Sequence, residues 1–171
     1  MTYVPLDQAL KHPLRALIHG FVHLHPGVRL GELAECLALE NSTLLWHLRK
    51  LEGANLVLRL DRPGARVYWS TKDGAEAKEL AGRVAWLNTE RRRAVLAEVV
   101  AEPGTTMPDV AKRLDIDAAA ARAAAGQLED AGLVERIEGT GAHQFFPGSD
   151  AAHALDVAER IQRSIERQAE T

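Results

Sequence analysis

The chain repeats one segment of itself after 77 residues, and this repeat constrains the fold more than any other feature. Residues 25–60 align with residues 102–137 without a gap. The ends of the two segments are nearly identical, LEGANLV at 51–57 and LEDAGLV at 128–134. Internal repeats indicate that one unit of structure occurs more than once, and a solenoid needs at least three copies. We therefore expect two similar domains.

Each copy predicts three helices followed by a β-hairpin. Apolar residues recur at helical spacing, residues suited to helix N-caps precede the third helix, and β-favouring runs flank a turn. The elements predicted in the first copy are helices over about 6–24, 29–38 and 41–55, and strands at 56–60 and 66–70 around Arg62-Pro63-Gly64. Those predicted in the second copy are helices over about 89–101, 106–114 and 117–132, and strands at 133–138 and 143–147.

Two further helices are predicted outside the copies, at 73–88 and 150–168, each with an apolar stripe along one side. The first would join the two domains and the second would end the chain. The predicted organisation is an N-terminal domain at 1–72, a linker helix at 73–88, a C-terminal domain at 89–148 and a C-terminal helix at 149–171.

Three helices and a hairpin are the order of a winged helix-turn-helix, and NSTLLWHLRKLEGANLV at 41–57 resembles the third helix of ArsR-like bacterial and archaeal transcription regulators. Those helices often read S-x-L-x-x-H-L-x-x-L-E-x-x-x-L-V. The matching positions are Ser42, Leu44, His47, Leu48, Leu51, Glu52, Leu56 and Val57. The resemblance covers about 11–72 well and 89–147 in outline. It implies a mainly α fold with small β-hairpin wings, two winged helix-turn-helix domains in tandem, binding to double-stranded DNA, and a homodimer.

The net charge of −3 conceals a difference between the two halves. Residues 11–72 contain nine Lys and Arg against five acidic residues, which is a net charge of +4. Residues 89–171 contain ten basic and fifteen acidic residues, which is −5. Because DNA affinity depends on cations that neutralise phosphates, the first copy is the better candidate for DNA contact.

The third helix of the first copy carries polar and cationic groups opposite the inward stripe of Leu44, Leu48 and Leu51. Such groups bind base edges and phosphates, and arginines beside a Pro-Gly turn suit a wing contact. The predicted DNA-contacting residues are Ser42, Thr43, Trp46, His47, Arg49, Lys50, Arg62 and Arg66. Two alternatives stay open: a charged face that is only solvated, and a Trp46 that covers apolar surface.

The second copy lacks this chemistry. Ala120, Ala123, Ala124 and Gln127 stand where the first copy has Thr43, Trp46, His47 and Lys50. Alanine has no donor, acceptor or charge, so this helix cannot read a base sequence. We predict that these four residues form a protein interface, with the first domain or with a second subunit. The alternative is a plain solvent-facing helix, since alanine is the best helix former.

The C-terminal helix carries a narrow apolar seam at Ala158, Ile161 and Ile165, which predicts a dimer contact. A dimer would match a palindromic DNA site. The alternative is that this helix folds back on its own domain.

No enzyme, metal or cofactor is expected. His19 and His23 have a spacing that can hold zinc, with His12 and His25 nearby, but no carboxylate or thiol stands beside them. The single cysteine, Cys36, is expected to be a small buried hydrophobe, with a one-thiol redox sensor as the alternative. Catalytic triads and phosphate-binding glycine loops are absent from the sequence.

The sequence thus predicts a cytoplasmic, DNA-binding transcription regulator without a membrane segment and with no effector indicated. The alternative is a protein-interaction scaffold or accessory factor of transcription or chromosome machinery, which tandem winged helices also form. The acidic second copy favours that alternative.

Overall fold

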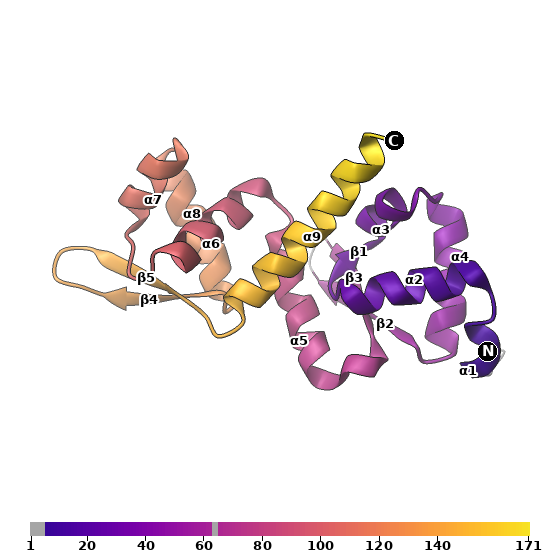
Figure 1. Ribbon diagram of the computed structural model, residues 1–171. Helices are drawn as coiled ribbons and strands as arrows, with labels where there is room; N and C mark the ends of the chain where they lie inside the picture. The colour runs from indigo at the N-terminus through magenta and orange to yellow at the C-terminus, as the bar shows by residue number, and fades with distance from the viewer. Residues whose placement is uncertain (1–5, 63–64) are drawn as a thin grey trace. The chain divides into compact units, whose positions relative to one another are not determined.

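The computed structural model describes residues 6–62 and 65–171 (Figure 1). The chain divides into two compact units, Met1–Ala85 with Glu159–Thr171, and Trp86–Ala158. The predicted turn residues Pro63 and Gly64 lie outside the described residues. No helix in the described ranges combines the length and the apolar character needed to cross a lipid bilayer.

Unit 1 contains a helical cluster and a three-stranded antiparallel sheet of order β1-β3-β2. Its buried side chains are mostly aliphatic, among them Ile18, Leu33 and Leu48. In chain order its elements are α1 (Leu6–Ala9), α2 (Pro13–Leu24), β1 (Val28–Arg29), α3 (Leu30–Leu37), α4 (Asn41–Gly53), β2 (Val57–Arg62), β3 (Ala65–Ser70), η1 (Thr71–Asp73) and α5 (Gly74–Val84).

Unit 2 repeats this arrangement with a two-stranded sheet, and its β4–β5 hairpin extends beyond its helices (Figure 1). Thr105 forms a single bridge to Phe145 in the place that β1 takes in unit 1. The elements are α6 (Glu90–Ala101), α7 (Met107–Leu114), α8 (Ala118–Asp130), β4 (Val134–Glu138) and β5 (His143–Pro147). The 3-10 turn η2 (Ala85–Leu87) precedes them, and α9 (Ala151–Ala169) follows.

The repeat found in the sequence is also a repeat in the structure. Each of α2, α3 and α4 begins and ends 77 residues before α6, α7 and α8. The hairpins keep the same register, because Val57 pairs with Ser70 and Val134 pairs with Pro147. The predicted class, mainly helical with small antiparallel hairpins, is therefore confirmed.

The helix predicted over 6–24 is interrupted, and α2 begins only at Pro13. Proline has no backbone N–H and disfavours a helical residue before it, so it is tolerated at the first helical position and starts a new helix. His12 caps this helix, since its Nδ1 accepts a hydrogen bond from Leu14 N at 3.2 Å.

Residues predicted as a linker helix form α5, which belongs to unit 1. Ala77 and Ala81 of α5 pack with Trp69 of β3, and Leu58 and Leu60 of β2 border the cluster. This helix therefore covers the sheet that supports the wing.

Gly27 joins α2 to β1 and lies against α5. Its φ of 89° is in the left-handed region, and a Cβ there would lie 2.7 Å from Ala81 O and 2.8 Å from Val84 Cβ. We expect Gly27→Ala to lower the free energy of unfolding by about 3 kcal/mol, from backbone strain and overpacking together. Urea denaturation measures this loss. Gly31→Ala is the control, because its Cβ would meet nothing within 4 Å, and an equal loss in the control would refute the explanation.

Candidate nucleic-acid interface

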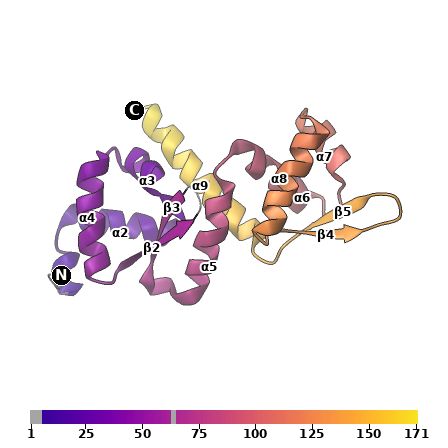
Figure 2. The same ribbon diagram turned by 180° about the vertical axis from the view of Figure 1, so that it is seen from behind.

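Helix α4 lies beside α2 in unit 1 (Figure 2). It buries one face and exposes the other. Leu44, Leu48 and Leu51 are buried, as the helical spacing predicted. On the opposite face Thr43, Trp46 and Lys50 follow one another at spacings of three and four residues, so they form one row, which we call the α4 row. Ser42 and Arg49 are exposed beside it.

Trp46 is the largest residue of the α4 row and is 52% exposed. Lys50 Nζ lies 5.6 Å from the centroid of the Trp46 ring. At this distance an ammonium group is attracted by the negative face of the ring. The pair combines an aromatic surface and a cation within one turn of helix.

His47 was predicted on the exposed face, and the structure corrects this. Its residue is only 5% exposed. The ring lies 4.9 Å from that of His12, the N-cap residue of α2, and 4.8 Å from that of Trp46, centroid to centroid. The physical reason is helical spacing, since position 47 is three residues after Leu44 and four before Leu51 and so shares the inward face. His47 supports Trp46 from beneath.

The environment of His47 favours a neutral ring. Burial lowers the pKa of His47, and His12 and Arg15 lower it further. Its Nδ1 is buried without a hydrogen-bond partner among the described residues. Burial is also the main cause that lowers the pKa of His19 and His25.

The wing brings arginines together around one carboxylate. Arg59 Nε and Arg66 Nε each lie 3.4 Å from an oxygen of Asp61, and all three side chains are exposed. Exposed ion pairs contribute little to stability, so these arginines can exchange Asp61 for a phosphate at small cost. Arg62 lies apart from them, since its guanidinium group covers Gly82 of α5, where a Cβ would be 2.8 Å from Nη2.

Arg59 was missed by the sequence analysis. The signal was the alternation of burial along β2, which puts residue 59 on the same outward side as Asp61. Arg66 was predicted, and the antiparallel register places it opposite Asp61.

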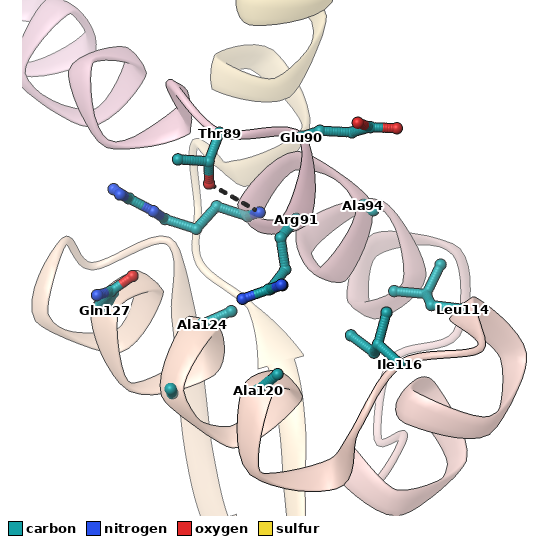
Figure 3. A pocket seen from close by; sticks show the side chains of 11 residues that line it. Thr89, Glu90, Arg91, Ala94, Leu114, Ile116, Ala120, Ala124 and Gln127 are labelled. Carbon is teal, nitrogen blue, oxygen red and sulfur yellow. Dashed lines mark hydrogen bonds between the residues drawn. The ribbon is translucent and has the colours of Figure 1, made fainter.

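In unit 2 the corresponding helix borders a groove of about 720 Å³ (Figure 3). Ala124 is buried, Ala120 is half-buried, and Ala123 and Gln127 are exposed. Leu114 and Ile116, just before α8, complete the apolar part of the lining. We call this space the α6–α8 groove.

Two arginines of α6, Arg91 and Arg92, line this groove. The guanidinium group of Arg91 is directed toward Ala120 and Ala124 (Figure 3). Its neighbours Arg92 and Arg93 instead donate hydrogen bonds to the carbonyl oxygens of Trp86 and Leu87. The three arginines therefore do not act as one basic patch.

The seam predicted on the C-terminal helix is mostly closed within the chain. Ala158 and Ile161 are buried, and Ile165 is half-buried. In unit 1 the Cys36 thiol donates a hydrogen bond to Ile161 O at 3.8 Å. This burial favours the alternative that the helix packs on its own chain.

The remaining candidate residues have local partners. His19 Nε2 lies 3.4 Å from Ser70 Oγ, and His23 Nδ1 lies 2.8 Å from Asp73 Oδ2. Within residues 6–62 and 65–171 no three His, Cys, Asp or Glu side chains are grouped as a metal site. Cys36 is buried, and its burial, together with Glu32 and Glu35, raises the pKa of the thiol to about 11.

Comparison with known proteins confirms the resemblance to winged helix-turn-helix regulators. Residues 89–143 match the model of the MarR family. A stretch of 132 residues, 77% of this chain, is 28% identical to an uncharacterized HTH-type transcriptional regulator of Methanocaldococcus jannaschii. The chain spans about a third of the length of that relative. The family match lies in unit 2, the copy in which the sequence resemblance was weaker.

Among solved structures, two similar chains are described as regulators. One is a homodimeric winged helix-turn-helix domain of Mycobacterium bovis, with 20% identity and a TM-score of 0.44 over 55% of this chain and 87% of that one. The other is the transcriptional regulator SlyA, with 19% identity and a TM-score of 0.42 over 58% of this chain and 68% of that one.

The buried histidines generate a pH prediction. A native-state pKa below the unfolded value of 6.5 means that the unfolded chain binds more protons in the window below about pH 6.5. The free energy of unfolding should therefore be at its full value above this pH and fall as the pH decreases through it. We expect His47→Gln to make the fall less steep, as measured by urea denaturation between pH 8 and pH 5.

His153→Gln is the matched control, since His153 is exposed on α9. Its pH dependence should match that of the parent chain. If His47→Gln also keeps the parental slope, His47 is not held neutral by the fold.

Proposed function

We propose that this chain, which resembles winged helix-turn-helix transcription regulators, binds duplex DNA through α4 and the β2–β3 wing of unit 1 and regulates transcription. The observation that carries the proposal is the α4 row on the third helix, in which Thr43 and Trp46 are exposed and Lys50 is half-buried beside the Trp46 ring. In winged and other helix-turn-helix proteins this helix enters the major groove.

In this proposal the side chains of α4 and of the wing contact different parts of the DNA. Ser42 and Thr43 can donate to or accept from base edges and phosphates near the start of α4. Arg49 and Lys50 neutralise phosphates, and Trp46 covers a sugar or a thymine methyl with its exposed ring. The wing adds Arg66 with Arg59, while Arg62 braces the wing against α5. His47 acts indirectly, by supporting Trp46.

Unit 2 serves assembly or regulation in this proposal. Its residues 86–158 contain seven Lys and Arg against twelve Asp and Glu, a net charge of −5. A phosphate backbone would be repelled by this excess of acidic groups. Ala120, Ala123, Ala124 and Gln127 then form a protein interface and make the chain a homodimer. The α9 residues Ala158, Ile161 and Ile165 hold that helix in place, because two of the three are buried.

A regulator of this kind works on DNA in the cytoplasm and needs neither a cofactor nor catalysis. In this proposal residues 1–72 contact DNA and residues 89–148 serve assembly. The α6–α8 groove and the net charge of −5 in unit 2 favour the second candidate, a protein-interaction scaffold without DNA contact.

Binding to mixed-sequence duplex DNA, measured by fluorescence anisotropy over a salt series, tests the proposal. The affinity should fall steeply with salt, since each phosphate contact releases counterions. In Lys50→Ala/Arg66→Ala the slope of log affinity against log salt should become shallower by about 1.8, because each lost contact contributes about 0.9.

The control is Lys112→Ala/Arg122→Ala, which removes two exposed cations from α7 and α8 of unit 2. It changes the net charge equally and should leave the slope as in the parent. Equal slopes in both double variants would assign the effect to net charge alone, and no binding at low salt would favour the scaffold.

A further inference from the structure

The α6–α8 groove occupies a place that is filled in unit 1. The two units correspond residue by residue at an offset of 77, so Ala123 and Ala124 stand where Trp46 and His47 stand, and Thr89 stands where His12 stands. In unit 1 those three rings form one cluster, with centroids 4.9 and 4.8 Å apart. In unit 2 the same helix pair has two methyl groups and a hydroxyl, and the groove results.

The groove has also gained a group that favours an aromatic occupant. Arg91 replaces Leu14 of unit 1, and its guanidinium group lies over the alanines (Figure 3). It makes no hydrogen bond or ion pair with the residues that the structure describes. This chain pairs other cations with indole rings, Lys50 with Trp46 at 5.6 Å and, beside the groove, Arg92 with Trp86 at 6.0 Å. A ring in the groove would offer Arg91 the same interaction.

The chain itself displays an aromatic side chain of this kind. Among the described residues the exposed large hydrophobic side chains are Leu17, Leu24, Trp46 and Ile137, of which only Trp46 is aromatic. Interface hot spots are enriched in tryptophan, tyrosine and arginine and lie in well-packed, desolvated pockets.

The charges of the two units also favour contact between copies. Unit 1 contains fourteen Lys and Arg against twelve acidic residues, a net charge of +2, and unit 2 has −5. Opposite charge accelerates encounter between the two surfaces and favours unit 1 of one copy against unit 2 of another.

We propose that the α6–α8 groove binds Trp46 of a second copy of this chain. The bound indole ring would fill the space beside Ala123, the residue that corresponds to Trp46 in unit 2. The contact is heterologous, since a side chain of one unit enters the other unit of the partner. It accounts for the retention of a third helix in unit 2 without base-reading residues.

This association would regulate the proposed DNA contact. Trp46 is the centre of the α4 row, so a copy whose Trp46 lies in a partner's groove cannot present that row to DNA. Self-association and DNA binding then compete. The competition rests on the proposed function, whereas the self-association itself does not.

Sedimentation velocity of the full chain without DNA tests the contact. The parent, of 18.7 kDa, should form dimers and larger species at micromolar concentration, because a heterologous contact leaves one Trp46 and one groove free at the ends of each pair. Trp46→Ala removes the side chain that enters the groove. Ala123→Trp fills the α6–α8 groove with the residue that unit 1 has at the corresponding position. Each should raise the dissociation constant by about 30-fold or more, the loss expected at an interface hot spot.

Mixing the two variants separates this contact from any other. Trp46→Ala keeps an intact groove and Ala123→Trp keeps an intact Trp46, so the mixture should associate again where each variant alone does not. An interface that pairs Trp46 with Trp46 would show no such recovery. Leu24→Ala and Ile137→Ala, at exposed apolar positions away from the groove lining, are controls that should associate like the parent.

The proposal is overturned if the parent is monomeric, if both variants associate like the parent, or if the mixture does not recover. Ala123→Glu tests the groove again with less added bulk than tryptophan, in case Ala123→Trp does not fold, and its charge should also prevent association. DNA binding is measured separately at concentrations where the chain is monomeric. Association without DNA binding would refute the proposed DNA contact but not this inference. DNA binding without association would refute this inference and the proposed homodimer but not the DNA contact.

Discussion

Each unit depends on the packing of two helices that correspond in the repeat, α2 against α4 in unit 1 and α6 against α8 in unit 2. This contact buries leucines of the third helix and determines which side chains remain for function. In unit 1 the rings of His12 and His47 close the contact, and Trp46 rests edge-on against His47. In unit 2 the same contact ends in Ala123 and Ala124 and leaves a groove. The residues at two corresponding positions thus distinguish the units: Trp46 and His47 give α4 an exposed aromatic ring, whereas Ala123 and Ala124 leave a groove beside α8.

The electrostatics of unit 1 follow the same division between support and presentation. Asp61 holds Arg59 and Arg66 close together on the outer side of the hairpin, where the ion pairs are weak enough to be exchanged. Arg62, by contrast, lies over Gly82, which has no side chain to exclude it. Of the arginines of the hairpin, Arg59 and Arg66 are therefore available to bind a phosphate, whereas Arg62 packs on α5 at the glycine that leaves room for it.

Much of the fold could be predicted because its signals are local. The 77-residue offset, the Leu44–Leu48–Leu51 stripe and the turn between the strands each depend on neighbours in the chain. The break before Pro13 also has a local signal, the missing N–H of proline. The helical spacing of apolar residues on both sides of it led to the prediction of one continuous helix. The site was less predictable: Thr43, Trp46, Arg49 and Arg66 are exposed as expected, but the position of His47 was wrong, and Arg59 was missed.

The sequence by itself determined the duplicated order of three helices and a hairpin, the opposite charges of the two halves and the absence of polar groups from the third helix of the second copy, because composition and periodicity carry these properties. Only the tertiary structure decided that His47 is buried against His12, that Ile161 is covered within the chain, and that Ala123 and Ala124 border an open groove. Burial depends on which helix packs opposite a residue, and a residue 35 positions away in the chain, such as His12 from His47, leaves no local signal of that contact.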